Sequence, residues 1–278
     1  MSSQPDRPPA QARPAGEGRA RALLRLLLPV IVLATATLGW EWVVRINAIP
    51  PYVLPGPFVV LRTLVADWSI LWESLLTTLL TTLEGFTAAA IGGVALALVF
   101  NQSKWLEYSL FPYAVILQVT PVIAIAPLLL IYLPQQTAVI VCAWIVAFFP
   151  VLSNTTLGLN SVDRNLAGLF QLYGASPTQT LLHLKLPSAL PFILGGLRIA
   201  GGLSLIGAVV AEIAAGSAGA GSGLAYRIAE SGYRLDIPRM FAALLLLSAA
   251  GIVIYGLLAL VSHLVLRRWH ESALGKEN

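Results

Sequence analysis

Long apolar runs constrain this chain more than any other feature of its sequence. Six segments approach or exceed the ~20 residues needed to cross the hydrocarbon core of a bilayer, and shorter polar stretches separate them. Of the 278 residues, 57% are hydrophobic and only 11% are charged, a balance that excludes a soluble domain. The sequence therefore predicts an all-α, polytopic membrane protein with six transmembrane helices, at about 26–44, 75–100, 110–133, 137–157, 192–215 and 240–266.

The ends of the chain differ in composition from this membrane domain. Residues 1–25 are rich in Pro, Ala and Arg and predict a disordered cytoplasmic tail. Residues 26–268 then form the transmembrane domain, and residues 269–278 form a second cytoplasmic tail.

Prolines mark the places where helices are expected to stop or bend. A group of them between 50 and 57 predicts an extended connection, followed by a short amphipathic helix at about 59–72. Pro121 and Pro127 fall within the third span, where each removes a backbone donor. We expect that span to be kinked and to line a cavity or pack internally. A short polar turn is expected at 101–107.

The basic residues predict how the chain is oriented. With the N-terminus inside, eleven Lys and Arg residues fall on the cytoplasmic side and five on the outer side, while Arg198 lies within the fifth span. The positive-inside rule then predicts a multi-pass protein of the cell inner membrane with both termini in the cytoplasm. Because the basic residues flank apolar runs, the net charge of +4 does not indicate nucleic-acid binding.

The segment 163–188 lies between two spans and reads as a helical elbow. Gly174 can take the left-handed conformation that closes a helix, and Ser176 can cap the next one, with Gln179 completing a capping box. The second helix is expected to stop at Pro187. From the residues alone, the elbow is equally a docking site for a cytosolic partner or an amphipathic helix lying on the lipid headgroups.

The elbow resembles the coupling loop in the permease subunits of binding-protein-dependent ABC importers. Gly174 is followed about a dozen residues later by Leu186 and Pro187, as in that family, although the family's acidic-Ala-Ala part is replaced by residues 168–170. Further motifs resemble the branch that serves nitrate, sulfonates, taurine and heterocyclic vitamin precursors, and they lie at 49–57, 120–127, 147–150 and 207–212.

The resemblance implies a type I importer permease with a MetI-like fold and an assembly around it. A second permease copy, ABC ATPase subunits, and a periplasmic or lipoprotein solute-binding protein are the expected partners, along with the bilayer. The sequence contains no phosphate-binding loop of the form G-x-x-x-x-G-K-[ST], so the expected ATP use belongs to the partner. The chain itself is expected to be no enzyme and to bind no cofactor or metal. The implied ATPase-coupling residues are Arg164, Leu169, Phe170, Gln171, Tyr173, Gly174, Ala175, Ser176 and Pro187.

The solute stays open at this stage. The resemblance allows a vitamin precursor such as a pyrimidine or riboflavin, or an anion of the sulfonate, taurine or nitrate type. The scarcity of charges within the spans favours a neutral or aromatic solute. A stand-alone secondary transporter is the alternative, but it would need coupling-ion ligands and inverted repeats that the sequence does not display. A membrane enzyme would need clustered His, Asp or Cys, and these residues are dispersed.

Two carboxylates lie within predicted spans, where burial is costly enough to make a function the first hypothesis. We expect Glu84 to serve packing by pairing with a backbone donor or with Arg198. Glu212 lies near the outer end of the fifth span and is either a gate residue or a structural one. With Pro121 and Pro127, it completes the set of candidate pathway or gate residues.

Overall fold

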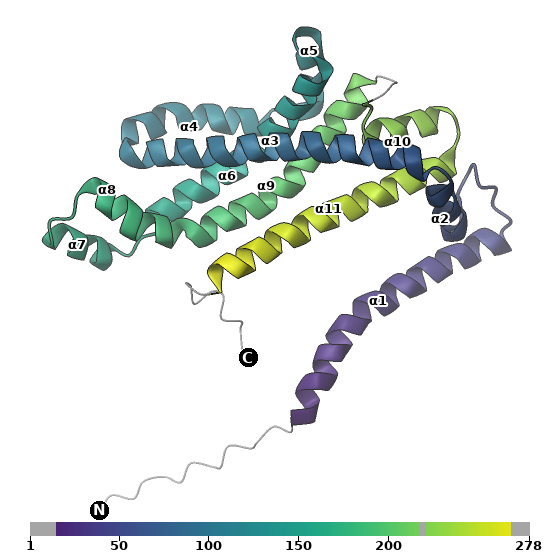
Figure 1. Cartoon of the computed structure of the whole chain (residues 1–278), viewed down its shortest axis with the longest axis horizontal. Helices are drawn as coiled ribbons and strands as arrows, with labels where there is room; N and C mark the ends of the chain where they lie inside the picture. Colours follow the sequence, from purple (N-terminus) through teal and green to yellow (C-terminus); the bar gives the residue numbers. More distant parts are fainter. Residues whose placement is uncertain (1–14, 217–220, 268–278) are drawn as a thin grey trace, which may run out of the picture.

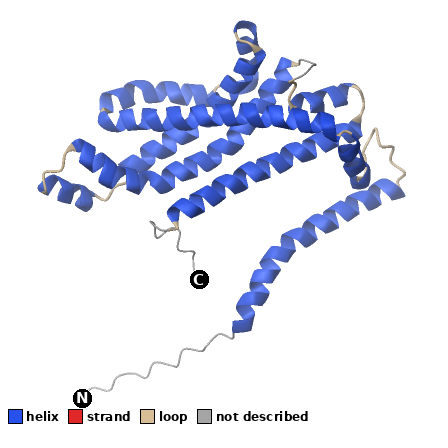
Figure 2. Ribbon diagram, in the orientation of Figure 1, coloured by secondary structure: helices blue, strands red, loops and turns tan. Residues whose placement is uncertain are grey.

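The computed structural model describes residues 15–216 and 221–267, and over these residues it consists of helices joined by short connections (Figure 2). The elements follow one another as α1 (Ala15–Ile46), α2 (Pro57–Ala66), α3 (Trp68–Gln102), α4 (Lys104–Val119), α5 (Val122–Tyr132), α6 (Gln135–Asn160), α7 (Arg164–Leu172), α8 (Pro177–Thr180), a π-helical turn (Leu181–Lys185), α9 (Leu186–Ala215), α10 (Leu224–Tyr233) and α11 (Ile237–Leu266).

Three long helices, α3, α6 and α9, form the centre of the bundle (Figure 1). Small residues allow them to approach one another closely. A Cβ added at Gly85 of α3 would lie 2.5 Å from the Cβ of Ala143 on α6, and one added at Gly207 of α9 would lie 2.7 Å from the carbonyl oxygen of Cys142. Glycine at these two positions therefore permits the close packing of the central helices.

The first and last long helices lie at the periphery. Few residues of α11 are buried, and the membrane-spanning part of α1 has almost none, so both helices present apolar surface to lipid or to another chain. Figure 1 shows α1 leaning away from the rest of the bundle. This helix begins at Ala15, so residues 15–25 are helical where the sequence predicted a disordered tail. Residues 1–14 and the C-terminal tail at 269–278 lie outside the described residues.

The third predicted span is not one kinked helix. It is divided into α4 and α5, which meet at an angle of 98°. Thr120 between them is extended, with φ −72° and ψ 123°, because a following proline disfavours the helical conformation of the residue before it. Pro127, in contrast, lies within α5 without interrupting it. In the described part of the chain, five helices are long and apolar enough to span a membrane, or six if the bent pair counts as one span.

Two other predicted boundaries also differ. The short amphipathic helix is α2, which ends at Ala66, and α3 begins directly afterwards at Trp68. The predicted polar turn at 101–107 is reduced to Ser103, because α4 starts at Lys104. The long helices place α7 and α8 at one end of the bundle, and α2 and α10 at the other (Figure 1).

Candidate functional site

The elbow begins with α7, whose two ends are closed by local hydrogen bonds. The side chain of Asp163 accepts a hydrogen bond from the backbone N–H of Asn165 at 2.7 Å, which caps the N-terminus. At the other end Gly174 has φ +68°. The N–H of Gly174 donates to the carbonyl of Gln171, and that of Ala175 donates to the carbonyl of Phe170, both at 3.0 Å. This is a Schellman motif, and its left-handed residue is the predicted glycine.

The capping box predicted at the start of α8 is also present. The backbone N–H of Gln179 donates to the Ser176 hydroxyl at 3.2 Å, and the backbone N–H of Ser176 donates to the Gln179 side chain at 2.8 Å. Pro177 occupies the first helical position, where its missing N–H costs nothing. The corner between α7 and α8 is therefore held by its own hydrogen bonds.

The sequence predicted that the second helix of the elbow stops at Pro187, but in the structure it does not. It continues through a π-helical turn, Leu181–Lys185, into α9, and the N–H of Leu186 bonds to the carbonyl of Leu181. The wider turn accommodates the proline, which lacks the N–H and would crowd the carbonyl four residues earlier in a regular α-helix. As a result, α8 and the central helix α9 form one continuous rod.

The predicted coupling residues lie together on this elbow, and most are exposed. On α7 and its cap, the exposed fractions are 48% for Leu169, 86% for Leu172 and 82% for Tyr173. These are large apolar side chains with no partner in the core. Arg164, Gln171, Gly174 and Ser176 are exposed as well, whereas Phe170, Ala175 and Pro187 are half-buried.

Two lysine contacts that the sequence did not reveal tie this end of the bundle together. Lys185, in the π-helical turn, donates to the side-chain oxygen of Asn101 at the end of α3, at 3.1 Å. Lys104 pairs with Glu107 at 2.6 Å and reaches Asn160 at the end of α6 at 3.4 Å. The two asparagines are far in sequence from the lysines they contact, so only the fold brings these pairs together. The elbow is thereby linked to α3 as well as to α9.

The candidate pathway or gate residues do not form a single group. Pro121 and Pro127 are exposed at the break before α5 and within it. Glu212 is buried near the end of α9, with 4% of its surface exposed. Ala126 of α5 and Ala211 of α9, the residues that precede Pro127 and Glu212, both belong to one buried cluster.

Glu212 connects three helices through hydrogen bonds. Its Oε2 atom accepts from the hydroxyl of Thr78 on α3 at 3.0 Å, and from the backbone N–H of Ala225 in the first turn of α10 at 3.1 Å. The Thr78 hydroxyl in turn accepts from the N–H of Leu224 at 2.8 Å. The other carboxylate oxygen, Oε1, is buried without a hydrogen-bond partner. The Glu212 carboxyl thus caps α10 from a different helix.

The other two charges within the spans do not pair as expected. Glu84 is exposed on α3 and has no hydrogen bond or ion pair within the described ranges, so the expected pairing with a backbone donor or Arg198 is wrong. Arg198 has a buried Nε atom without a partner, and its guanidinium carbon lies 5.9 Å from the ring centroid of Tyr255 on α11. It therefore contacts an aromatic face and no carboxylate.

No group of three or more His, Cys, Asp and Glu among the residues that the structure describes is arranged to hold a metal ion.

A helical membrane bundle that presents a capped elbow at one end has the architecture of the membrane subunit of an ABC transporter. The chain belongs to the family described as the binding-protein-dependent transport system inner membrane component, whose model matches residues 85–267. It is therefore a transport permease of the inner membrane and not an enzyme.

Two relatives resemble it over most of their length. The riboflavin transport system permease protein RibX of Chloroflexus aurantiacus is 32% identical over 261 residues, which cover 91% of this chain and 96% of the relative. The formylaminopyrimidine transport permease protein ThiX of Halalkalibacterium halodurans is 33% identical over 229 residues, covering 82% and 90%. The family and branch that the sequence motifs indicated are confirmed.

Solved structures show the same fold. An amino acid ABC transporter crystallised with histidines contains a chain that superposes with a TM-score of 0.59 at 20% identity, over 72% of this chain and 96% of that one. The predicted importer permease fold is confirmed. Permeases of this family act with a separate solute-binding protein and ATPase, so the predicted partner classes follow from the family as well.

Proposed function

We propose that this chain forms the solute pathway of an ABC importer as one of two copies. A partner ATPase would dock on the elbow at α7 and α8, and a solute-binding protein would deliver the solute at the opposite end. The cargo is a small organic compound. The observation that carries the proposal is the continuity of α8 with α9, because a partner that moves the elbow would move a central helix of the bundle with it.

The exposed side chains of the elbow suit a protein partner. Leu172 and Tyr173 are among the most exposed large apolar side chains of the chain, and they stand on a helix whose ends are both capped. Such a helix loses little conformational freedom on docking, which favours binding. In the competing interpretation the same residues lie on lipid headgroups. That interpretation does not explain why the corner is held by a Schellman motif and a capping box.

Recovery of the ATPase with tagged permease tests this proposal. Truncating a hot-spot side chain of an interface weakens the complex by more than about 1 kcal/mol, or roughly five-fold. Leu172→Ser and Tyr173→Ser should therefore each lower the ATPase that co-purifies. Val65→Ser, at a residue 76% exposed at the far end of the bundle, is the matched control and should lower nothing. Equal recovery from all three variants would assign the elbow to the headgroups.

A second copy of the chain would cover surface that is unsuited to lipid. Glu84 is exposed near the middle of α3, a helix of a length and hydropathy that span the bilayer. An unpaired carboxylate is costly in hydrocarbon, so burial against another protein chain is favoured. Cross-linking from a cysteine introduced at the neighbouring Leu83, which is 58% exposed, would report a homodimer. A monomer in the assembled transporter would refute this part of the proposal.

The proposed orientation puts the N-terminus, the C-terminus and the elbow in the cytoplasm. It rests on the excess of basic residues on that side. Thr178→Cys at the elbow should react with a membrane-impermeant maleimide only after cells are permeabilised. Reaction in intact cells would reverse the orientation and remove the elbow from the ATPase.

For the solute we propose a heterocyclic vitamin or vitamin precursor of the pyrimidine or flavin type. The two relatives named for such solutes align with this chain over more than four-fifths of its length. Few charged residues lie within the spans, which also suits an uncharged planar solute. The test measures uptake by the reconstituted transporter of riboflavin and formylaminopyrimidine on one side and of taurine and nitrate on the other. The solutes that are taken up decide the chemical class of the cargo. Transport of the anions alone would reject the vitamin assignment.

A further inference from the structure

The short helix α10 packs against three helices at the end of the bundle opposite the elbow. It lies against the N-terminal part of α3, the C-terminal part of α9 and the start of α11. Its first residues, Leu224 and Ala225, are fully buried, although the helix itself is amphipathic and near the surface. Gly221 before it has φ +98°, and Leu235 after it has φ +58°, so a turn delimits α10 at each end.

The buried end of α10 is fastened by Glu212 and Thr78. The two N–H groups at its start, which have no partner within the helix, donate to the Thr78 hydroxyl and to the Glu212 carboxylate. Gly223 lies so close to this carboxyl group that a Cβ at this residue would collide with it. The glycine is therefore required for the carboxylate to reach the helix. We call Thr78, Glu212 and Gly223 the clamp.

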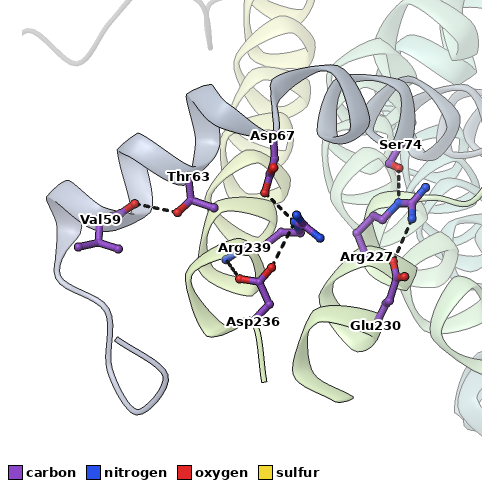
Figure 3. A network of polar contacts seen from close by, with 8 residues as sticks. All are labelled: Val59, Thr63, Asp67, Ser74, Arg227, Glu230, Asp236 and Arg239. Atoms are coloured by element: carbon purple, nitrogen blue, oxygen red, sulfur yellow. Dashed lines mark hydrogen bonds and ion pairs between the residues drawn. The ribbon is translucent and has the colours of Figure 1, made fainter. Parts of the chain in front are cut away.

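Beyond the clamp, further polar contacts join α10 and the start of α11 to one face of α3 (Figure 3). The Nε atom of Arg227 donates to the Ser74 hydroxyl at 3.1 Å, and that of Arg239 donates to the carboxylate of Asp67 at 2.6 Å. Asp67 at the N-cap of α3 and the α3 residues Ser74 and Thr78 are spaced by seven and four residues, which places them along one side of the helix. Separation of α10 from α3 would break the Arg227–Ser74 hydrogen bond together with the clamp contacts, whereas the Arg239–Asp67 contact anchors the start of α11.

The closed arrangement leaves buried polar atoms unsatisfied. The Oε1 atom of Glu212 and the hydroxyl of Ser231, on α10, are both buried without a hydrogen-bond partner. Water would satisfy both atoms if α10 lifted, which offsets part of the loss of the clamp bonds. Among the described residues, α10 is held to α3 by two hydrogen bonds, from Leu224 to Thr78 and from Arg227 to Ser74, so its lifting requires few hydrogen bonds to be broken.

We propose that α10 is a lid over the outer ends of α3 and α9, and that the clamp of Thr78, Glu212 and Gly223 holds it closed between transport cycles. Glu212 is then a positioning residue that acts through the backbone of α10. This inference rests on the proposed function and on the proposed orientation, with α10 on the outer side.

A cysteine on the underside of the lid would report its opening. Ser231 is 1% exposed and its hydroxyl has no partner, so Ser231→Cys is close to isosteric and breaks no hydrogen bond. Cys142, the only native cysteine, is fully buried and would be replaced by Ala. The measurement is the rate at which a membrane-impermeant maleimide labels Ser231→Cys from outside, in transporter complexes that retain their ATPase.

Clamp variants should open the lid where matched variants do not. Thr78→Val and Gly223→Ala should raise the labelling rate at least ten-fold, whereas Thr78→Ser, which keeps the hydroxyl, should leave it near the wild-type rate. The controls are Thr77→Val, whose hydroxyl bonds only within α3, and Gly232→Ala, whose added Cβ would meet the Met240 sulfur at an ordinary 3.6 Å. Rates that do not differ between clamp and control variants overturn the lid.

A second arm uses the wild-type clamp, so it does not depend on the folding of any clamp variant. The complex carrying only the probe substitutions is labelled at rest, and again with ATP and the loaded binding protein present. Faster labelling during turnover supports a lid that opens in the cycle, and an unchanged rate overturns it. A permease that never recovers an ATPase would instead contradict the proposed function, so the two failures are distinguishable.

Discussion

Gly174 offers the sharpest test of the coupling elbow. Its φ of +68° lies in the left-handed region, and a Cβ built there would meet nothing within 4 Å. The cost of a substitution is therefore confined to the backbone, at about 1–2 kcal/mol for an L-residue and more for a β-branched one. Since 1.4 kcal/mol is ten-fold, Gly174→Val should reduce the population of correctly closed elbow by roughly ten-fold or more.

The matched control is a second glycine on the same helix. Gly168 lies within α7, also in open space, but with ordinary helical geometry. Gly168→Ala should therefore stabilise α7 by about 0.5–1 kcal/mol, while Gly174→Ala should destabilise its end by about 1 kcal/mol. The same chemical change has opposite signs at the two places. Gly174→Asn should be tolerated best, because asparagine adopts the left-handed conformation more readily than other non-glycine residues.

The assay is solute uptake per ATP hydrolysed in the reconstituted transporter, with ATPase recovery measured alongside. Gly174→Val should lower the coupling ratio or the recovery, with little change in thermal stability, because α7 has no buried residue. Normal recovery together with normal coupling in Gly174→Val would refute the reasoning. An equal loss in Gly168→Ala would do so too, because it would show that α7 tolerates no change of any kind.

Three further predictions concern the bundle and its two ends. Gly207→Ala should reduce the free energy of unfolding by about 1–3 kcal/mol and lower the melting temperature of the permease, because the new Cβ would press on the backbone of α6. Gly202→Ala, on the same helix but in open space, should leave the melting temperature unchanged. Lys185→Ala and Asn101→Ala should each reduce stability by about 0.5–1.5 kcal/mol and be non-additive when combined, and full additivity in denaturation would count against their hydrogen bond. Asp67→Asn should lower the melting temperature by removing a partly buried ion pair with Arg239, and an unchanged value would show that the pair contributes nothing.

Much of the membrane architecture was predictable because bilayer thickness imposes a length on each apolar run. The helices α6, α9 and α11 contain the three predicted C-terminal spans, and the left-handed Gly174 and the capping box at Ser176 follow from local chemistry alone. These features depend on residues that are neighbours in sequence. Capping, turn conformation and hydrophobic length are all decided within a few residues or within one helix.

The tertiary structure decided what happens at the prolines. The sequence marks Pro121, Pro127 and Pro187 as helix breakers alike, yet only the first interrupts a helix. A π-helical turn before Pro187 relieves the crowding and leaves the elbow continuous with α9. Whether a proline breaks a helix depends on how the freed backbone groups are satisfied and packed, which a one-dimensional pattern does not contain.

The role of Glu212 was likewise undecided in the sequence, because its partners are remote. Thr78 lies 134 residues away along the chain, and the carboxylate accepts its other hydrogen bond from Ala225, on the helix that follows α9. Composition identified a costly carboxylate in an apolar run, whereas folding supplied the hydrogen-bond donors that stabilise it. Long-range pairing is set by the packing of whole helices, so the chemistry of this site exists only in the folded bundle.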